Sequence, residues 1–303
     1  MVTKLVLDMD PGIDDALALL AACRWPQVDL LGVSVVAGNL PLETVTANAS
    51  GILRTVGAES QVYKGASMPL HGKLVDAADI HGAQGLGYWQ IEADSQRVSS
   101  LHAVQFLAET ARKFPHAVTL VATGPLTNVA LALEHHPKEM EMLAGVVLMG
   151  GALTVPGNVT PVAEYNIYAD PDAAELVINS GLNLTMVGLD VTRKVYLDSR
   201  DIENLSSQGR LAQVATAMAS YYLERFEQLP LHDPLALLAA VRPEFFDFQD
   251  VAVKIETWGE HCRGQTLVDW DGSHGWSKNV KVALGVDAQG CRELLMDLWG
   301  LCI

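Results

Sequence analysis

The sequence is poor in basic residues. Its 20 lysines and arginines stand against 36 aspartates and glutamates, so the formal net charge is −16 at pH 7. Nucleic acid polymers and acidic membrane surfaces are bound through basic patches, because their phosphate groups must be neutralised. The composition therefore argues against both of these partners. It is compatible with a metal cation or with a small uncharged substrate.

Cysteines are also scarce, and their spacing is not that of a metal site. Cys23, Cys262, Cys291 and Cys302 include no CxxC pair, so we expect free, reduced thiols. No apolar run approaches the roughly 20 residues of a membrane span, and the N-terminus has no pattern of a signal peptide. We therefore expect a cytoplasmic protein that does not enter a membrane.

The features that usually divide a chain into domains are missing as well. There is no linker rich in proline, serine and glycine, no internal repeat and no low-complexity segment. Half of the 303 residues are hydrophobic, which is enough for a large core. We expect residues 1–303 to form one domain.

What the sequence does contain is an alternation of short β-branched runs with longer helical patterns. The expected strands are 4–9, 30–37, 117–123, 144–150 and 182–190, and the expected helices are 14–23, 41–56, 100–113, 127–134 and 171–179. Strands that are apolar along their whole length are typical of sheets covered on both faces. This order predicts an α/β fold, an open, mainly parallel, doubly wound (Rossmann-like) sheet with helices on both faces.

The last third of the chain predicts a mixed region. The expected helices are near 208–228, at 232–241 and at 287–300, and the expected strands are 251–257, 265–270 and 279–286. Two further segments, 65–99 and 151–168, are expected to be long loops. Loops of that length in a compact domain are usually functional or disordered.

Carboxylates crowd the end of the first expected strand, in the stretch DMDPGIDDA. Two of them, Asp14 and Asp15, begin a helix, where a carboxylate is favourable for that reason alone. Asp8 and Asp10 lie at the end of a buried strand, where unpaired charges are costly. Ligands of parallel sheets bind at this edge, and oxygen atoms suit Ca²⁺ or Mg²⁺. The cluster therefore predicts a site for a hard cation.

Further polar residues follow other strand ends or lie in expected loops, namely the motif HDP at 232–234, His81, Glu164, Asn166, Asn39 and Asn158. Each has an ordinary structural explanation, because such residues cap helices, form turns or lie on the surface. As functional residues, this mixture of hydrogen-bond donors and acceptors would suit the hydroxyl groups of a sugar. The residues alone leave both interpretations open.

Taken together, the motifs resemble one family. DMDPGIDDA, VAGN, ATGPLTN, VVLMGG, GNVTPVAEYN, GLDVT and HDP occur in the order found in nucleoside hydrolases of the inosine–uridine-preferring type. The resemblance is closest to bacterial ribonucleoside hydrolases and spans about residues 3–300. It implies an N-glycosyl hydrolase that cleaves purine or pyrimidine ribonucleosides, or both, to ribose and free base. It also implies a homodimer or homotetramer.

The resemblance further implies roles for individual positions. Those matching the family's Ca²⁺ ligands are Asp10, Asp15, the backbone carbonyl of Thr123, and Asp233, and Asp10 also matches the general base that activates water. Those matching contacts to the ribose are Asp14, Asn39, Asn158, Glu164 and Asn166, with Met149 beneath the sugar. Phe226 matches a residue of the segment that covers the base. His232 and His81 are both candidates for protonating the departing base.

Two alternatives belong to other functional classes. The run DMD also resembles the DxD of haloacid-dehalogenase-type phosphatases, which use Mg²⁺ and an aspartyl nucleophile. That class has Thr or Val after its second Asp, whereas Pro11 and Gly12 follow here. The other alternative is a non-catalytic, metal-dependent protein that binds a nucleoside or ribose. The match of Asp10 to a general base argues against it, since a sensor needs no base.

Overall fold

The centre of the molecule is a ten-stranded sheet. The computed structural model describes residues 2–205 and 209–300. The strands run in the order β11 (Thr266–Asp269), β10 (Phe246–Ile255), β12 (Val280–Val286), β7 (Leu184–Val187), β6 (Gly145–Met149), β5 (Val118–Ala122), β1 (Thr3–Met9), β2 (Val28–Val35), β3 (Val62–Lys64) and β4 (Val98–Ser99). Neighbours from β12 to β4 are parallel, and only β10 pairs antiparallel, with β11 and β12. The predicted parallel sheet with a mixed C-terminal part is confirmed.

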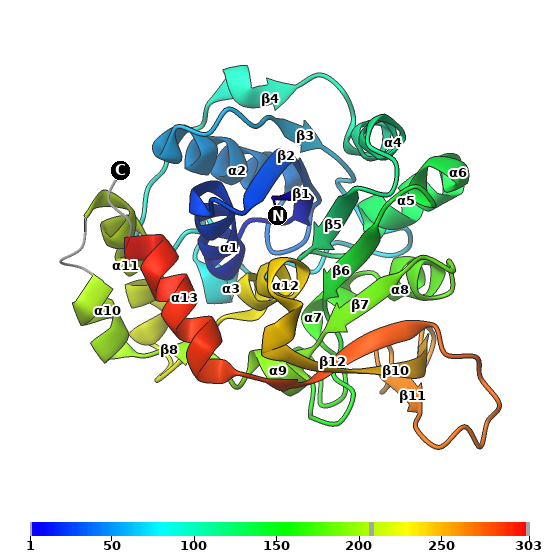
Figure 1. Ribbon diagram of the computed structural model, residues 1–303. Helices are drawn as coiled ribbons and strands as arrows, with labels where there is room; N and C mark the ends of the chain where they lie inside the picture. Colours follow the sequence, from blue (N-terminus) through cyan, green and yellow to red (C-terminus); the bar gives the residue numbers. More distant parts are fainter. Residues whose placement is uncertain (1, 206–208, 301–303) are drawn as a thin grey trace.

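The sheet buries both of its faces, because successive side chains of a strand point in opposite directions. In β1, Leu5, Leu7 and Met9 join one core cluster, whereas Val6 joins the other. The first cluster is completed by α1 (Ile13–Arg24), α2 (Leu42–Val56), α11 (Arg210–Leu223), α12 (His232–Val241) and α13 (Ala288–Gly300). The second is completed by α4 (Ala103–Lys113), α5 (Thr127–His135) and α8 (Pro171–Ile178), so helices cover both faces (Figure 1).

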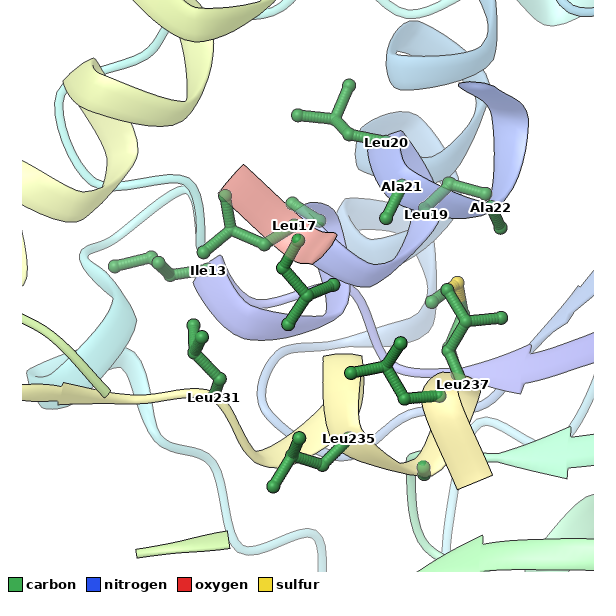
Figure 2. Packing of buried hydrophobic residues seen from close by; sticks show 14 of the residues in the cluster. Ile13, Leu17, Leu19, Leu20, Ala21, Ala22, Leu231, Leu235 and Leu237 are labelled. Carbon is green, nitrogen blue, oxygen red and sulfur yellow. The ribbon is translucent and has the colours of Figure 1, made fainter. Parts of the chain in front are cut away.

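Helix α1 is enclosed by protein, and this fixes the position of the acidic stretch before it. All residues from Ile13 to Ala22 are buried. Figure 2 shows buried residues of α1 beside Leu231, which precedes α12, and beside Leu235 and Leu237 within it. On another side, the Trp299 indole Nε1 donates a hydrogen bond to the Leu17 carbonyl, 3.0 Å away. The N-terminal ends of α1 and α12, which carry acidic residues, are thereby held next to each other.

Several short elements complete the described chain. The helices are α3 (Ala78–His81), α6 (Pro137–Met140), α7 (Tyr165–Ala169), α9 (Leu189–Thr192) and α10 (Ser199–Leu205), with 3₁₀ turns at Ser95–Arg97 and Pro243–Phe245. Strands β8 (Tyr196–Leu197) and β9 (Leu229–Pro230) pair as a separate two-stranded sheet. None of the helices in the described ranges is long and apolar enough to cross a membrane. Cys23, Cys262 and Cys291 carry free thiols as expected, and Cys302 lies outside the described residues.

Some predicted boundaries were wrong. The strand expected at 182–190 ends at Val187, and Gly188 is the N-cap of α9, so Asp190 lies on a helix. The helix expected near 208–228 ends at Leu223, because the chain must turn to pair β9 with β8, and residue 208 lies outside the described ranges. The loop expected at 65–99 contains α3 and β4. Elements of two to four residues carry too little periodicity to be recognised without their tertiary partners.

Candidate active site

A pocket of about 540 Å³ opens at the carboxyl ends of the parallel strands. Eleven of the residues that the sequence singles out line it, namely Asp14, Asn39, His81, Thr123, Met149, Asn158, Glu164, Asn166, Phe226, His232 and Asp233. They come from segments far apart in the chain, and the sheet brings them together because its strands end at one edge. Asp10 and Asp15 are fully buried and do not line the pocket.

Asp10 follows the last residue of β1 and is enclosed by backbone. Its Oδ2 accepts a hydrogen bond from the Asn39 backbone N–H at 2.6 Å. Its Oδ1 has no hydrogen-bond partner among the residues that the structure describes. A Cβ atom at Gly38 would stand 2.1 Å from Oδ2, and one at Gly124 would stand 2.7 Å from Oδ1. The carboxylate can occupy this position only because both neighbouring residues are glycine.

Three more carboxylates gather beside it. Asp14, Asp15 and Asp233 each place one oxygen within 4.8 Å of the others. Asp15 is fixed in orientation, since its Oδ1 accepts from the Thr123 hydroxyl at 2.8 Å and its Oδ2 from the Gly12 N–H at 3.1 Å. The group is thus a concentrated negative charge at the inner end of the pocket.

The electrostatics of these carboxyls are unfavourable without a positive partner. Burial raises the pKa of Asp14 and of Asp15 to about 6, and the charge of Asp14 adds to the effect on Asp15. Burial raises the pKa of Asp10 and of Asp233 well above the usual range, and neighbouring acidic residues raise both further. A cation placed among these groups would favour their ionised forms.

The donor set fits a hard divalent cation. It consists of carboxylate oxygens, including the unpartnered Asp10 Oδ1, together with the Thr123 carbonyl at the pocket wall. That carbonyl accepts a hydrogen bond from Asn166 Nδ2 at 2.7 Å and keeps a second lone pair. Oxygen ligands of this kind suit Ca²⁺ or Mg²⁺, whereas zinc sites are built largely from nitrogen and sulfur.

The amide side chains of the pocket are oriented by their protein partners. Asn39 Nδ2 donates to the Asp10 carbonyl at 3.1 Å, and Asn166 Nδ2 donates to the Thr123 carbonyl, so each keeps its Oδ1 as an acceptor. Asn158 is oriented the other way, because its Oδ1 accepts from the Tyr165 N–H at 2.9 Å. Its Nδ2 is therefore left as a donor. The pocket offers a substrate both kinds of hydrogen-bonding group.

Glu164 caps α7 and is buried. Its carboxylate accepts hydrogen bonds from the backbone N–H groups of Gly151, Asn166 and Ile167 at 2.9–3.2 Å. Burial raises the pKa of Glu164 to about 7, although these donors oppose the effect. The side chain is thus held rigidly at the pocket wall as a further acceptor.

Both candidate histidines are held through one ring nitrogen. His81 Nδ1 accepts a hydrogen bond from the Ile13 backbone N–H at 3.0 Å, so the proton of the neutral ring is on Nε2. His232 Nδ1 lies 2.7 Å from the Thr192 hydroxyl. Burial lowers the pKa of each histidine to about 4. In this arrangement both rings are neutral near pH 7.

The sequence reasoning missed several residues of this site. Tyr165, Tyr222 and Arg193 line the pocket. Thr192 and Asp190 lie on α9 and contact His232 and the segment after β6, respectively. The motif GLDVT was used only as a strand end and as one of the motifs that carry the family resemblance. Its contacts join residues that lie about 40 positions apart, which no local pattern reveals.

Comparison with known proteins gives a consistent result. A family model described as inosine-uridine preferring nucleoside hydrolase matches residues 5–293. The non-specific ribonucleoside hydrolase RihC of Shigella boydii is 39% identical over 297 residues, covering 97% of this chain and 97% of that protein. Uridine nucleosidase 1 of Arabidopsis thaliana is 36% identical over 306 residues, covering 96% of this chain and 91% of that protein. The structure of a purine-preferring ribonucleoside hydrolase from Gardnerella vaginalis superposes with a TM-score of 0.93 at 32% identity and covers 98% of both chains.

Proposed function

Since this chain belongs to the inosine-uridine preferring nucleoside hydrolase family and is an N-glycosyl hydrolase, we propose its substrates, metal and catalytic base. The substrates are purine and pyrimidine ribonucleosides, which are hydrolysed to ribose and free base. The metal is Ca²⁺, and the base is Asp10. Family membership removes the phosphatase and the non-catalytic binding protein as explanations of the acidic cluster.

The metal would be held by Asp10, Asp15, Asp233 and the carbonyl of Thr123. The observation that carries this assignment is the buried Asp10 Oδ1, which lacks a hydrogen-bond partner in the described chain and lies beside three clustered carboxylates. The bound cation would orient the sugar hydroxyls and lower the pKa of a water molecule.

Asp10 would accept a proton from the attacking water. Its Oδ2 accepts from the Asn39 N–H and its Oδ1 is the proposed metal ligand, so the proton would be taken up on a remaining lone pair of the carboxylate. General base catalysis of this kind typically contributes about 10²–10⁴ in rate. Attack from the face opposite the base would invert the configuration of the anomeric carbon.

Ribose would be recognised by Asp14, Asn39, Asn158, Glu164 and Asn166, with Met149 beneath the ring. Their acceptors and donors match hydroxyl groups, which can both give and receive hydrogen bonds. As the glycosidic bond breaks, positive charge develops on the sugar, and fixed carboxylates such as Asp14 and Glu164 stabilise it. A 5′-phosphate would be repelled by Glu164, which favours nucleosides over nucleotides.

The departing base takes up the bonding electrons and is stabilised by a proton donor. His232 is the first candidate and His81 the second. Because both rings are neutral near pH 7, either one would have to take up a second proton before it could donate one to the base. A riboside such as p-nitrophenyl riboside, whose leaving group is stable as an anion, needs no such donor.

The test is a panel of ribonucleosides in which free ribose and free base are both measured. We expect equal amounts of ribose and base from purine and pyrimidine members, and no phosphate from the matching nucleotides. A protein that released no ribose from any member of the panel would contradict the proposal.

A further inference from the structure

The short helix α9 and the residue after it make side-chain hydrogen bonds to the segment that carries Asn158. Asp190, which is buried, accepts hydrogen bonds from the backbone N–H of Leu153 at 2.9 Å and of Thr154 at 2.8 Å. Arg193 follows the last residue of α9 and lines the pocket. Neither Asp190 nor Arg193 has a part in the function proposed above.

Arg193 makes a second set of contacts with this segment. Its Nη1 donates to the Pro156 carbonyl and its Nη2 to the Gly157 carbonyl, both at 2.7 Å. A guanidinium holds two acceptors at once because its N–H groups form a rigid planar fork. The two carbonyls belong to the residues immediately before Asn158. The guanidinium therefore fixes the backbone from which the Asn158 side chain enters the pocket.

This backbone needs such a support. Between the end of β6 and the start of α7 the described chain has neither helix nor strand apart from an isolated bridge at Ala163. Gly157 lies so close to the returning chain that a Cβ atom would stand 2.2 Å from the Ala163 carbonyl oxygen. Asn158 itself is exposed, and its N–H donates to that same carbonyl at 3.1 Å. Its placement thus depends on individual contacts and not on a regular element.

We propose that Arg193 is a positioning residue for ribose recognition, which acts by holding Pro156 and Gly157 so that Asn158 presents its Nδ2 donor to a sugar hydroxyl. The inference rests on the proposed contact between Asn158 and the ribose. Because Nη1 and Nη2 of Arg193 each donate to a backbone carbonyl next to Asn158, we expect its effect to pass through Asn158. Asp190 anchors the same segment at its other end.

The experiment compares Arg193→Met, Asn158→Ala and the double variant, with KM and kcat measured separately for uridine and inosine. A neutral hydrogen bond contributes up to about tenfold in binding, so each single variant should raise KM by roughly tenfold and change kcat little. The double variant should be no worse than Asn158→Ala alone, since residues that act in series are not additive. Arg193→Lys, which can reach one carbonyl, should recover part of the loss.

A second readout uses the 2′-, 3′- and 5′-deoxy analogues of uridine. For the analogue that lacks the hydroxyl contacted by Asn158, Asn158→Ala and the parent protein should have the same KM. Arg193→Met should lose the preference for uridine over that same analogue and should keep the preference for uridine over the other two. The matched control is Lys194→Met, which removes a neighbouring positive charge. The Nζ of Lys194 donates to the Leu284 carbonyl and not to the Asn158 segment. Lys194→Met should keep the parent KM.

The outcomes distinguish a failure of the proposed contact between Asn158 and ribose from a failure of the positioning role of Arg193. If Asn158→Ala left KM and analogue selectivity unchanged, the proposed ribose contact of Asn158 would be wrong and the role of Arg193 with it. If Asn158→Ala raised KM but Arg193→Met did not, or if the two effects multiplied in the double variant, only the positioning role would be overturned.

Discussion

The two ends of the pocket are built differently. At the inner end, Asp10 and Asp15 are fully buried, and their neighbours are fixed by strand ends and by hydrogen bonds to backbone. At the outer end, the wall comes from α3 and from the segment after α11, where Phe226 is 41% exposed. The inner end resembles the interior of the protein and the outer end resembles its surface.

This contrast has a consequence for function. Metal binding, water activation and the ribose contacts of the buried residues are common to every nucleoside and are assigned to the rigid inner end. Those buried ribose contacts are Asp14, Asn39, Glu164 and Asn166. Contacts that depend on the identity of the base are assigned to the exposed outer end, where side chains change at little cost in stability. The relatives named above carry names that differ in substrate preference, since one is called a uridine nucleosidase, one non-specific and one purine-preferring. Substitutions at the two ends should therefore differ in magnitude and in substrate dependence.

The largest effect is expected for Asp10→Asn. The amide keeps the size of the side chain and an oxygen atom but cannot accept the proton of the attacking water. We expect kcat to fall by about 10³-fold for inosine, uridine and p-nitrophenyl riboside alike. The assays must be made at saturating Ca²⁺ with the bound metal measured, because loss of the ion would mimic loss of the base. A loss confined to one class of base would contradict the assignment of Asp10 to the common steps.

The second-largest effect is expected when the substrate lacks its 2′-hydroxyl group. A 2′-deoxynucleoside leaves buried partners at the inner end without their hydroxyl, which typically costs a few kcal/mol. We expect kcat/KM for 2′-deoxyuridine to lie about 10²-fold below that for uridine, and the same ratio to hold for the purine pair. Equal turnover of uridine and 2′-deoxyuridine would contradict the assignment of 2′-hydroxyl recognition to residues at the inner end.

A smaller and selective effect is expected for His232→Ala. Removing a proton donor from the leaving-group side should lower kcat for inosine and uridine by about 10- to 100-fold. The same variant should hydrolyse p-nitrophenyl riboside at nearly the parent rate, and the exposed His71→Ala should change neither rate. If His232→Ala slowed p-nitrophenyl riboside as severely as inosine, His232 would instead be positioning Asp233, and His81 would become the proton donor to test.

The smallest effect is expected for Phe226→Ala at the outer wall. The ring is 41% exposed and lies at the outer wall of the pocket, so its loss should leave the chemistry at the inner end intact. Aromatic contacts of this kind are worth about 0.5–1.5 kcal/mol, which corresponds to a few-fold rise in KM. The rise should differ between inosine and uridine because their bases differ in size. A large fall in kcat would mean that the two ends are not separable.

The same contrast explains what could be predicted from the sequence. Asp10, Asp14 and Asp15 follow a strand whose apolar run is plain, so the strand end, the helix start and the acidic site were all predictable. The strand at 182–190 was extended too far, and this concealed Asp190 and Thr192 as helix residues. Their roles arise from contacts with Thr154 and His232. Such contacts depend on how distant segments dock, which periodicity and propensity do not encode.

The central claim is that the carboxylates at the inner end work only around a hard cation. Its most direct test is the rate of ribose release by protein from which metal has been exhaustively removed by a chelator, followed by addition of Ca²⁺. We predict that activity on inosine, uridine and p-nitrophenyl riboside disappears together and returns together when about one Ca²⁺ per chain is bound. Full activity in the chelated protein, with metal analysis showing none bound, would contradict the claim.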